Sequence, residues 1–304
     1  MTDHSKIVYN QVDCLLCGST NNRILLSDKT NVVKCRNCGL VYSNPRIDDK
    51  INRENISEQG DFDINRYNAL RNYEMPKFRR ELDKIGKIKE PGRILDVGCG
   101  NGNFLECAQM RNWETYGVDV NPASKVPCSK FGNIFIGTLE EAKYHDNFFE
   151  VVFSSSTFYY LTDPLTFLCE VKRILKPGGL LVVLGILNIK SLSARINVRN
   201  FIKPYPPNQV SFYFDVHHLK VLTIRSGLCI LKQKTSGLGS PLTDVFKSKQ
   251  DDSTGLSENQ ESSSIYKEHF KSNPVIDFSR SIVNFFLDLF RLGYHISLYA
   301  VKGE

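Results

Sequence analysis

The sequence predicts an α/β fold, in which a mainly parallel sheet is covered by helices, preceded by a small cysteine-rich module. From Arg93 onward, short apolar runs alternate with helical stretches, as in chains of strand-helix units. One run, "LLVVLGI", is apolar throughout, as expected for a strand buried on both faces. Four cysteines lie within the first forty residues. The 304 residues are enough for a module and a large domain with a buried core.

The overall composition is typical of a soluble globular protein, with 41% hydrophobic and 24% charged residues. A net charge of +6 is mild and does not require a nucleic-acid partner. The first twenty residues have no apolar core of signal-peptide length, and the longest apolar run, Gly179–Leu187, is too short to span a bilayer. Nine cysteines without a secretory signal favour a reducing, cytoplasmic compartment.

The N-terminal module, residues 1–50, has two Cys-x2-Cys pairs separated by seventeen residues: Cys14 and Cys17, then Cys35 and Cys38. A glycine follows each pair, as in tight turns that present two thiolates to one metal. Four thiolates match a closed tetrahedral zinc site, so we expect structural zinc, with iron as the alternative metal. Disulfides are the remaining alternative. A segment this small has little core of its own, so metal binding would contribute to its folding.

Residues 51–90 are polar with apolar residues at roughly helical spacing, which predicts one or two helices as a linker or cap. The third region, 91–304, contains the strand-helix units. Predicted strands are "RILDV", "TYGVDV", "NIFI", "EVVFSS" and "LLVVLGI", followed by a strand at about Cys229–Gln233 and a last one, "HISLYAVK". Predicted helices include "NFLECAQMR" and "PLTFLCEVKRIL", the second ending at Lys176–Gly179 because Pro and Gly cannot continue it.

Two C-terminal segments differ from this pattern. Residues 234–274 are rich in Ser, Gln, Asn, Asp and Lys, and we expect a mobile, polar insert there. Residues 275–291 form an amphipathic helix with several phenylalanines on its apolar side. This helix would cover the sheet edge or close over the pocket; alternatively, it would contact a membrane or a lipid-linked acceptor.

The loop "DVGCGNG" follows the first strand of the large domain. Without side chains at Gly98, Gly100 and Gly102, the backbone and the next helix N-terminus can approach a ligand closely. By itself the loop is equally compatible with a tight turn. It lacks the lysine of a phosphate-binding loop. Asp96 before it can hold an ammonium group, and Asp119, at the end of the second strand, can accept both hydroxyls of a ribose.

At this point the chain resembles the class I S-adenosylmethionine-dependent methyltransferases. Five pieces match in order: "ILDVGCGNGNFL", "GVDVNPAS", "GTLEEA", "FFEVVFSSSTFYYLTDP" and "VKRILKPGGLLVV". The resemblance covers about residues 92–233, with the last strand matching more loosely. It implies a Rossmann-like sheet of seven strands in the order 3-2-1-4-5-7-6, flanked by helices, with the seventh strand antiparallel.

The resemblance also implies the cofactor contacts. The methionine part of S-adenosylmethionine would be bordered by Asp96, Gly98, Cys99, Gly100 and Gly102, with Cys99 contributing its backbone. Asp119 would take the ribose hydroxyls and Val120 would lie against the adenine. Thr138 and Leu139 would lie near the adenine edge, and Ser155 with Ser156 would face the sulfonium.

The chain departs from many small-molecule and quinone O-methyltransferases at Tyr160, where these have histidine. A phenol with its ordinary pKa near 10 is a poor base at neutral pH, so Tyr160 cannot simply replace that histidine as a base. Tyr160 therefore either positions the acceptor, acts as a tuned acid or base, or simply lines the pocket. The pair His217 and His218 could reach the pocket or serve packing.

The ending of the cysteine module, "CGLVYSNPR", resembles that of bacterial methyltransferases with an N-terminal zinc ribbon, a group linked to sugars, polysaccharides, lipids and other small metabolites. The prediction is thus a methyltransferase for a small-molecule, sugar or lipid-linked acceptor. An RNA methyltransferase is the first alternative, although the first fifty residues carry seven Lys and Arg against five Asp and Glu and no basic run. A cofactor-binding scaffold without catalysis is the second. The sequence does not decide the oligomeric state.

Overall fold

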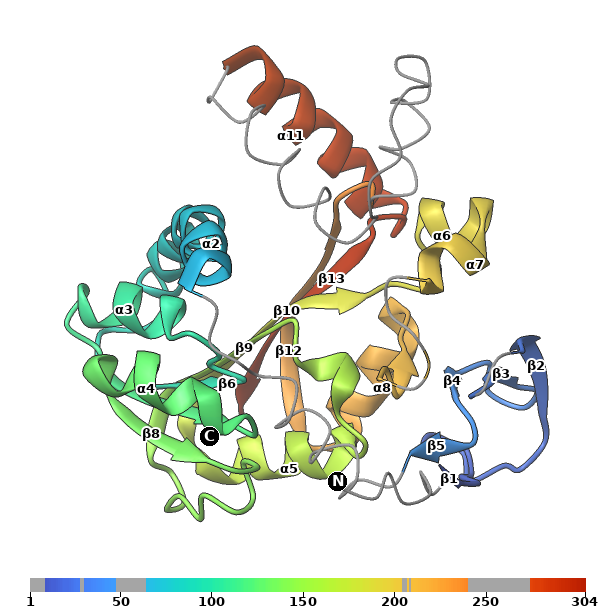
Figure 1. Cartoon of the computed structure of the whole chain (residues 1–304), viewed down its shortest axis with the longest axis horizontal. Helices are drawn as coiled ribbons and strands as arrows, with labels where there is room; N and C mark the ends of the chain where they lie inside the picture. The colour runs from blue at the N-terminus through green and yellow to red at the C-terminus, as the bar shows by residue number, and fades with distance from the viewer. Residues whose placement is uncertain (1–8, 28–29, 48–63, 204–206, 208, 240–273) are drawn as a thin grey trace, which may run out of the picture.

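The computed structural model describes residues 9–27, 30–47, 64–203, 207, 209–239 and 274–304, and its centre is a seven-stranded sheet (Figure 1). The strands lie in the order β12-β13-β10-β9-β6-β7-β8. Their bounds are β6 Arg93–Val97, β7 Glu114–Asp119, β8 Asn133–Ile136, β9 Phe149–Ser155, β10 Leu175–Leu187, β12 Leu228–Ser236 and β13 His295–Lys302. β13 is antiparallel to both neighbours, and the pairs from β10 to β8 are parallel. The predicted Rossmann-like order 3-2-1-4-5-7-6 is confirmed.

Helices cover both faces of this sheet. On one face, α2 (Ile64–Ile85) and α3 (Asn103–Gln109) pack their apolar side chains on every second strand residue, such as Ile94 and Val151. On the other face, α5 (Pro164–Ile174) and α8 (Val216–Arg225) cover the alternate residues, such as Leu95 and Val152. The remaining helices are η1 Pro122–Ser124, α4 Lys125–Cys128, η2 Ser129–Phe131, η3 Phe158–Tyr160, α6 Leu192–Ile196, α7 Val198–Ile202 and α11 Pro274–Leu289.

Helix α5 begins and ends as its sequence predicts. The Asp163 carboxylate accepts hydrogen bonds from the backbone N–H groups of Leu165 and Thr166, which caps the helix start. The helix ends at Ile174, one residue before the end of the predicted segment, and Lys176–Gly179 do not continue it. They belong to β10, whose pairing with β9 shifts between Leu175 and Leu180. Pro177 has no N–H for the ladder, so the strand bulges there before pairing resumes.

The cysteine module is a small sheet that is not complete by itself. β1 (Tyr9–Asn10) pairs with β5 (Arg46–Ile47). β2 (Asn22–Leu26), β3 (Val32–Cys35) and β4 (Val41–Ser43) form a second sheet, and its fourth strand, β11 (Phe212–Tyr213), comes from the large domain. Leu40 and Tyr42 of the module lie in the same apolar core as α5 and α8. The module is therefore joined to the large domain by both a sheet and a core.

Two predicted segments lie partly outside the described residues. Of the expected linker, α2 is described and packs on the central sheet. Of the polar insert, residues 240–273 lie outside the description. The predicted C-terminal helix is present as α11, which projects from one end of the sheet (Figure 1). No helix among the described residues combines the length and apolar character needed to cross a membrane.

Candidate active site and metal centre

The loops after four parallel strands meet at one edge of the sheet. β9, β6, β7 and β8 are neighbours, so their carboxyl ends lie side by side. The loops touch: a Cβ on Gly98 would lie 2.1 Å from Oγ1 of Thr157, which follows β9. The Gly137 N–H donates to the Asp119 carbonyl at 2.9 Å, which links the ends of β8 and β7. In α/β sheets of this kind, ligands bind at the carboxyl ends of the strands.

The glycine loop has the left-handed backbone that its sequence suggests. Gly98, Gly100 and Gly102 have φ values of 78°, 50° and 76°. The Gly98 and Cys99 N–H groups donate to the Val118 carbonyl at 2.8 and 3.2 Å, which holds the loop against β7. A Cβ on Gly100 would meet no atom within 4 Å, so this is the point where a ligand can approach the backbone.

Asp119 ends β7 beside this loop. Its Oδ2 accepts from the Gly100 N–H and its Oδ1 from the Asn121 N–H, both at 2.8 Å. Burial raises the pKa of Asp119, although these two N–H groups act to lower it. Each carboxylate oxygen has a second lone pair, so Asp119 can still accept two hydroxyl donors.

Asp96 is buried near the end of β6. Two further hydrogen-bond acceptors, on Glu74 and Asn103, belong to this site, and the sequence analysis did not identify them. Burial raises the pKa of its carboxyl well above the ordinary value, and the negative charges of Asp119 and Glu74 add to this. Glu74, on α2, accepts a hydrogen bond from Asn103 Nδ2 at 2.9 Å. Oδ1 of Asn103 is buried without a partner in the described structure. A donor-rich cation such as an ammonium group fits these acceptors.

The other predicted cofactor residues follow the same strand ends. Val120 and Ser155 are half-buried, directly after β7 and at the end of β9. Thr138 follows β8, and its N–H donates to Glu141 at 2.8 Å. Leu139 is only 3% exposed and lies in the main core, so its side chain serves packing. Cys99 is also buried, with its Sγ 3.8 Å from that of Cys128.

Tyr160 ends η3, the short helix that follows β9. Its ring lies 4.5 Å from that of Tyr159 and packs at the border of a cluster that includes Val32 and Val41 of the cysteine module. The sequence left three roles open for Tyr160: positioning the acceptor, acting as an acid or base, or lining the pocket. The structure packs it against the cluster that includes Val32 and Val41 of the module, and its role stays a prediction.

Of the two adjacent histidines, His218 connects the large domain to the cysteine module. Its Nδ1 is 2.9 Å from Oδ1 of Asp215, the capping residue of α8, and its Nε2 is 2.9 Å from the Cys38 carbonyl. It is buried by these contacts, and Lys190 pairs with the second Asp215 oxygen at 2.6 Å. The packing interpretation of His218 therefore agrees with its contacts.

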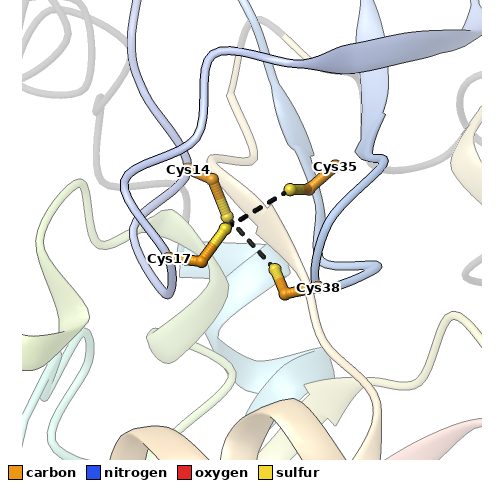
Figure 2. Close-up of side chains that lie close together, drawn as sticks. All are labelled: Cys14, Cys17, Cys35 and Cys38. Atoms are coloured by element: carbon orange, nitrogen blue, oxygen red, sulfur yellow. Dashed lines mark hydrogen bonds between the residues drawn. The ribbon is translucent and has the colours of Figure 1, made fainter.

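The four module cysteines converge, as Figure 2 shows. All four Sγ atoms lie within 4.8 Å of one another, with Cys14 and Cys38 at 3.3 Å and Cys17 and Cys35 at 3.5 Å. Tetrahedral zinc with Zn–S bonds of about 2.3 Å needs sulfur atoms about 3.8 Å apart. The cluster therefore has the donor set and size for one such ion.

The backbone around Cys35 favours its thiolate. Burial acts to raise its pKa, but the N–H groups of Cys38 and Asn37, with the neighbouring thiols, outweigh burial and lower the pKa to about 6. A thiolate is the form that binds metal.

Comparison with known proteins agrees with this geometry. Residues 95–183 match the family model described as a methyltransferase domain. This segment of the chain is similar to that family, and it makes up less than half of the chain. The matched residues include the glycine loop, Asp119 and β9, so the strand ends described above lie within the matched segment.

Two curated relatives are similar to part of the chain. The ubiquinone biosynthesis O-methyltransferase of Cereibacter sphaeroides is 32% identical over 98 residues, covering 30% of this chain and 39% of that protein. The demethylmenaquinone methyltransferase of Tropheryma whipplei is 28% identical over 111 residues, covering 35% of this chain and 46% of that protein. The chain thus matches less than half the length of each of these relatives.

A solved structure extends the likeness of the fold beyond the methyltransferase domain. The SAM-dependent methyltransferase from Archaeoglobus fulgidus superimposes with a TM-score of 0.51 at 22% identity, covering 76% of this chain and 94% of that one.

Proposed function

We propose that this protein is an S-adenosylmethionine-dependent methyltransferase acting on a small-molecule, sugar or lipid-linked acceptor. One observation carries the proposal: in the methyltransferase domain, Asp96 and Asp119 flank a glycine loop whose backbone is open at Gly100. This is a site for a ligand with an ammonium group and a ribose but without a phosphate. The names of the relatives, which refer to ubiquinone biosynthesis and demethylmenaquinone, support a small-molecule acceptor.

Each residue then has a role in holding the donor. Asp96 and Glu74, with the free Oδ1 of Asn103, accept from the ammonium group. Asp119 accepts from the ribose hydroxyls while the Gly100 N–H fixes its orientation. Val120, Thr138 and Leu139 would lie near the adenine, and Ser155 would face the reacting centre.

When bound, S-adenosylmethionine supplies a methyl group activated by a positively charged sulfur. The protein's contribution is to align the acceptor and exclude water at the ends of β6 and β9. A base is required only if the acceptor is protonated at neutral pH. We propose that the Tyr160 side chain lies next to the bound acceptor.

The test begins with calorimetric titration of S-adenosylhomocysteine, followed by a metabolite screen with methyl-labelled S-adenosylmethionine. Asp119→Asn should weaken binding about tenfold or more, because a carboxylate that accepts two hydroxyls is lost. Glu90→Gln, an exposed change near the opposite end of β6, is the control. Binding without transfer to any acceptor would favour the scaffold alternative, and no binding would reject the proposal.

Tyr160→Phe, assayed with the acceptor that the screen identifies, tests the role of the phenol. Unchanged turnover would leave Tyr160 as a lining residue, and a loss of a hundredfold or more would assign it a proton transfer.

We further propose that Cys14, Cys17, Cys35 and Cys38 hold structural zinc. The cluster size and the four sulfur donors support zinc, and four protein ligands leave no position open for catalysis. Elemental analysis of protein purified without added metal distinguishes zinc from iron.

Helix α11 supports the lipid-linked form of the acceptor. It and the following residue expose six large apolar side chains: Ile282, Val283, Phe285, Phe286, Leu289 and Phe290. Such a surface suits a membrane interface, where a lipid-linked acceptor would be reached. Co-sedimentation with anionic and neutral vesicles tests this, and a Phe285→Ser/Phe286→Ser variant should lose any binding.

A further inference from the structure

The segment from Tyr159 to Thr162, which carries Tyr160, is held at both ends. At its end, the Thr162 carbonyl accepts a hydrogen bond from Nη1 of Arg46, in β5 of the cysteine module, at 2.9 Å. At its start, the Tyr159 carbonyl accepts from the Ser211 N–H at 3.0 Å. Both anchors are backbone carbonyls, so they fix the course of the main chain on either side of Tyr160.

The second anchor, the hydrogen bond between Ser211 and Tyr159, is also connected to the cysteine module. Ser43, at the end of β4, is fully buried; its N–H donates to the Ser211 carbonyl at 3.0 Å and its hydroxyl to the Val210 carbonyl at 2.6 Å. Ser211 therefore joins β4 on one side to Tyr159 on the other. The β4–β11 pairing continues this contact through Phe212 and Tyr213.

Apolar packing reinforces these two anchors. The Arg46 guanidinium lies 4.9 Å from the centre of the Phe212 ring, so the side chain that holds Thr162 is itself held by β11. Val32 and Val41, from β3 and β4, lie in one apolar cluster with the buried Tyr159, and Tyr160 packs against it.

The donor side of the site is built differently. The glycine loop bonds to Val118 and Asp119, and Asp119 bonds to Gly100 and Asn121. These groups belong to β6, β7 and their loops, so loss of the module should leave them in place.

We propose that the cysteine module positions the acceptor side of the active site: through Arg46 and Ser43 it holds the segment Tyr159–Thr162, while the donor side forms without it. Arg46 and Ser43 are positioning residues for Tyr160. The inference rests on the proposed function in one respect only: that methyl transfer takes place at the carboxyl ends of these strands.

Hydrogen–deuterium exchange of the full metal-loaded chain tests the proposal. The Tyr160 N–H, bonded to the Thr157 carbonyl, and the Ser211 N–H report on the segment. Arg46→Ala should speed exchange in peptides over 156–163 roughly three- to tenfold, because one net hydrogen bond is lost. Arg46→Lys, which keeps a donor, should restore at least part of the protection. Arg23→Ala, an exposed arginine in β2 of the same module, should have no effect.

Removing the metal with a chelator should speed exchange in the same peptides more than in peptides over β6 and β7, when exchange is measured well below the melting temperature of the chelated protein. The affinity for S-adenosylhomocysteine should stay within about twofold. With the acceptor from the screen, Arg46→Ala should raise the acceptor KM and leave the donor KM within about twofold. Unchanged exchange over 156–163 in both Arg46→Ala and the chelated protein would overturn the inference. Failure of S-adenosylhomocysteine to bind the wild-type protein would instead count against the proposed function. It would leave the inference about the module untouched, because the exchange experiment is done without ligand.

Discussion

At the scale of single residues, the carboxyl group of Asp96 links ligand binding to pH. Burial and two nearby carboxylates raise its pKa in the free protein, so it holds a proton to higher pH than an exposed aspartate. An ammonium ligand favours the charged carboxylate, so binding should release a proton. The affinity for S-adenosylhomocysteine should therefore fall as the pH falls through this raised pKa. Calorimetry in two buffers with different ionisation enthalpies measures the proton release.

Asp96→Asn is the matched variant for this measurement, since it keeps the shape and removes the titrating group. It should abolish the proton release and weaken binding above the raised pKa of Asp96, while the two proteins should bind with similar affinity below it. Equal proton release in the variant and the wild type would assign the linkage to another group.

Two glycines of the loop should respond differently to alanine. Gly98→Ala would place a Cβ 2.1 Å from Thr157 Oγ1 at a φ of 78°, so it combines a clash with backbone strain. We expect a loss of about 2–4 kcal/mol in the free energy of unfolding. Gly100→Ala adds only strain of about 1 kcal/mol, because its Cβ meets open space. Urea denaturation should separate the two variants.

For ligand binding we expect the larger effect at Gly100. Its methyl group would fill the position where the ligand approaches the backbone, so Gly100→Ala should lose affinity for S-adenosylhomocysteine although it remains folded. Normal affinity in this variant would place the ligand elsewhere.

The sequence located only part of this site. The glycines and the acids at the strand ends are adjacent in sequence to elements with clear patterns, so Asp96 and Asp119 were identified correctly as ends of β6 and β7. Glu74 was missed because it lies on α2, outside the strand-helix units, and only the packing of α2 on α3 brings it to Asn103. Asn103 was missed because a polar residue at a helix start is equally typical of an ordinary helix.

At the scale of elements, α2 is tied to the central sheet by a buried polar contact. The Tyr299 hydroxyl of β13 donates to Oε1 of Glu81 at 2.6 Å, and Glu81 is only 3% exposed. Tyr299→Phe should cost about 1–3 kcal/mol in unfolding free energy, because a buried carboxylate loses its donor. Lys84→Ala, which removes the largely exposed second partner of Glu81, should cost less than about 1 kcal/mol. Equal losses of unfolding free energy in the two variants would contradict a special contribution from the buried hydrogen bond between Tyr299 and Glu81.

The elements with strong periodicity were predicted well, and the short ones were not. The strand-helix alternation predicted a mainly parallel sheet, and the resemblance carried by the five motifs implied its strand order. β11 has two residues, too few for any period, and it is a strand only because β4 offers it a partner. The role of His218 was likewise undecidable from sequence, since its partners are Asp215 and a carbonyl 180 residues away.

At the scale of the whole molecule, the four-cysteine cluster and the seven-stranded sheet should unfold together. Cys14, Cys35 and Leu40 lie in the same apolar core as α5 and α8, and the module sheet includes β11. A chelator should therefore lower the melting temperature of the whole chain in one transition, since metal binding favours the folded state. Differential scanning calorimetry with and without chelator measures this. A second transition for the module, with the domain transition unmoved, would show two independent units.

The pairing of β4 with β11 also means that the sheet of the cysteine module cannot be completed until late in translation. Ser43 and its partner Val210 are 167 residues apart, so the four cysteines leave the ribosome long before the last strand of their own sheet. Contacts between such distant residues form slowly because a long loop must close first. Until then the edge of β4 has no partner and is open to pairing with other chains. Production of this protein should therefore depend most on protecting the nascent chain between the completion of the metal site and the arrival of β11.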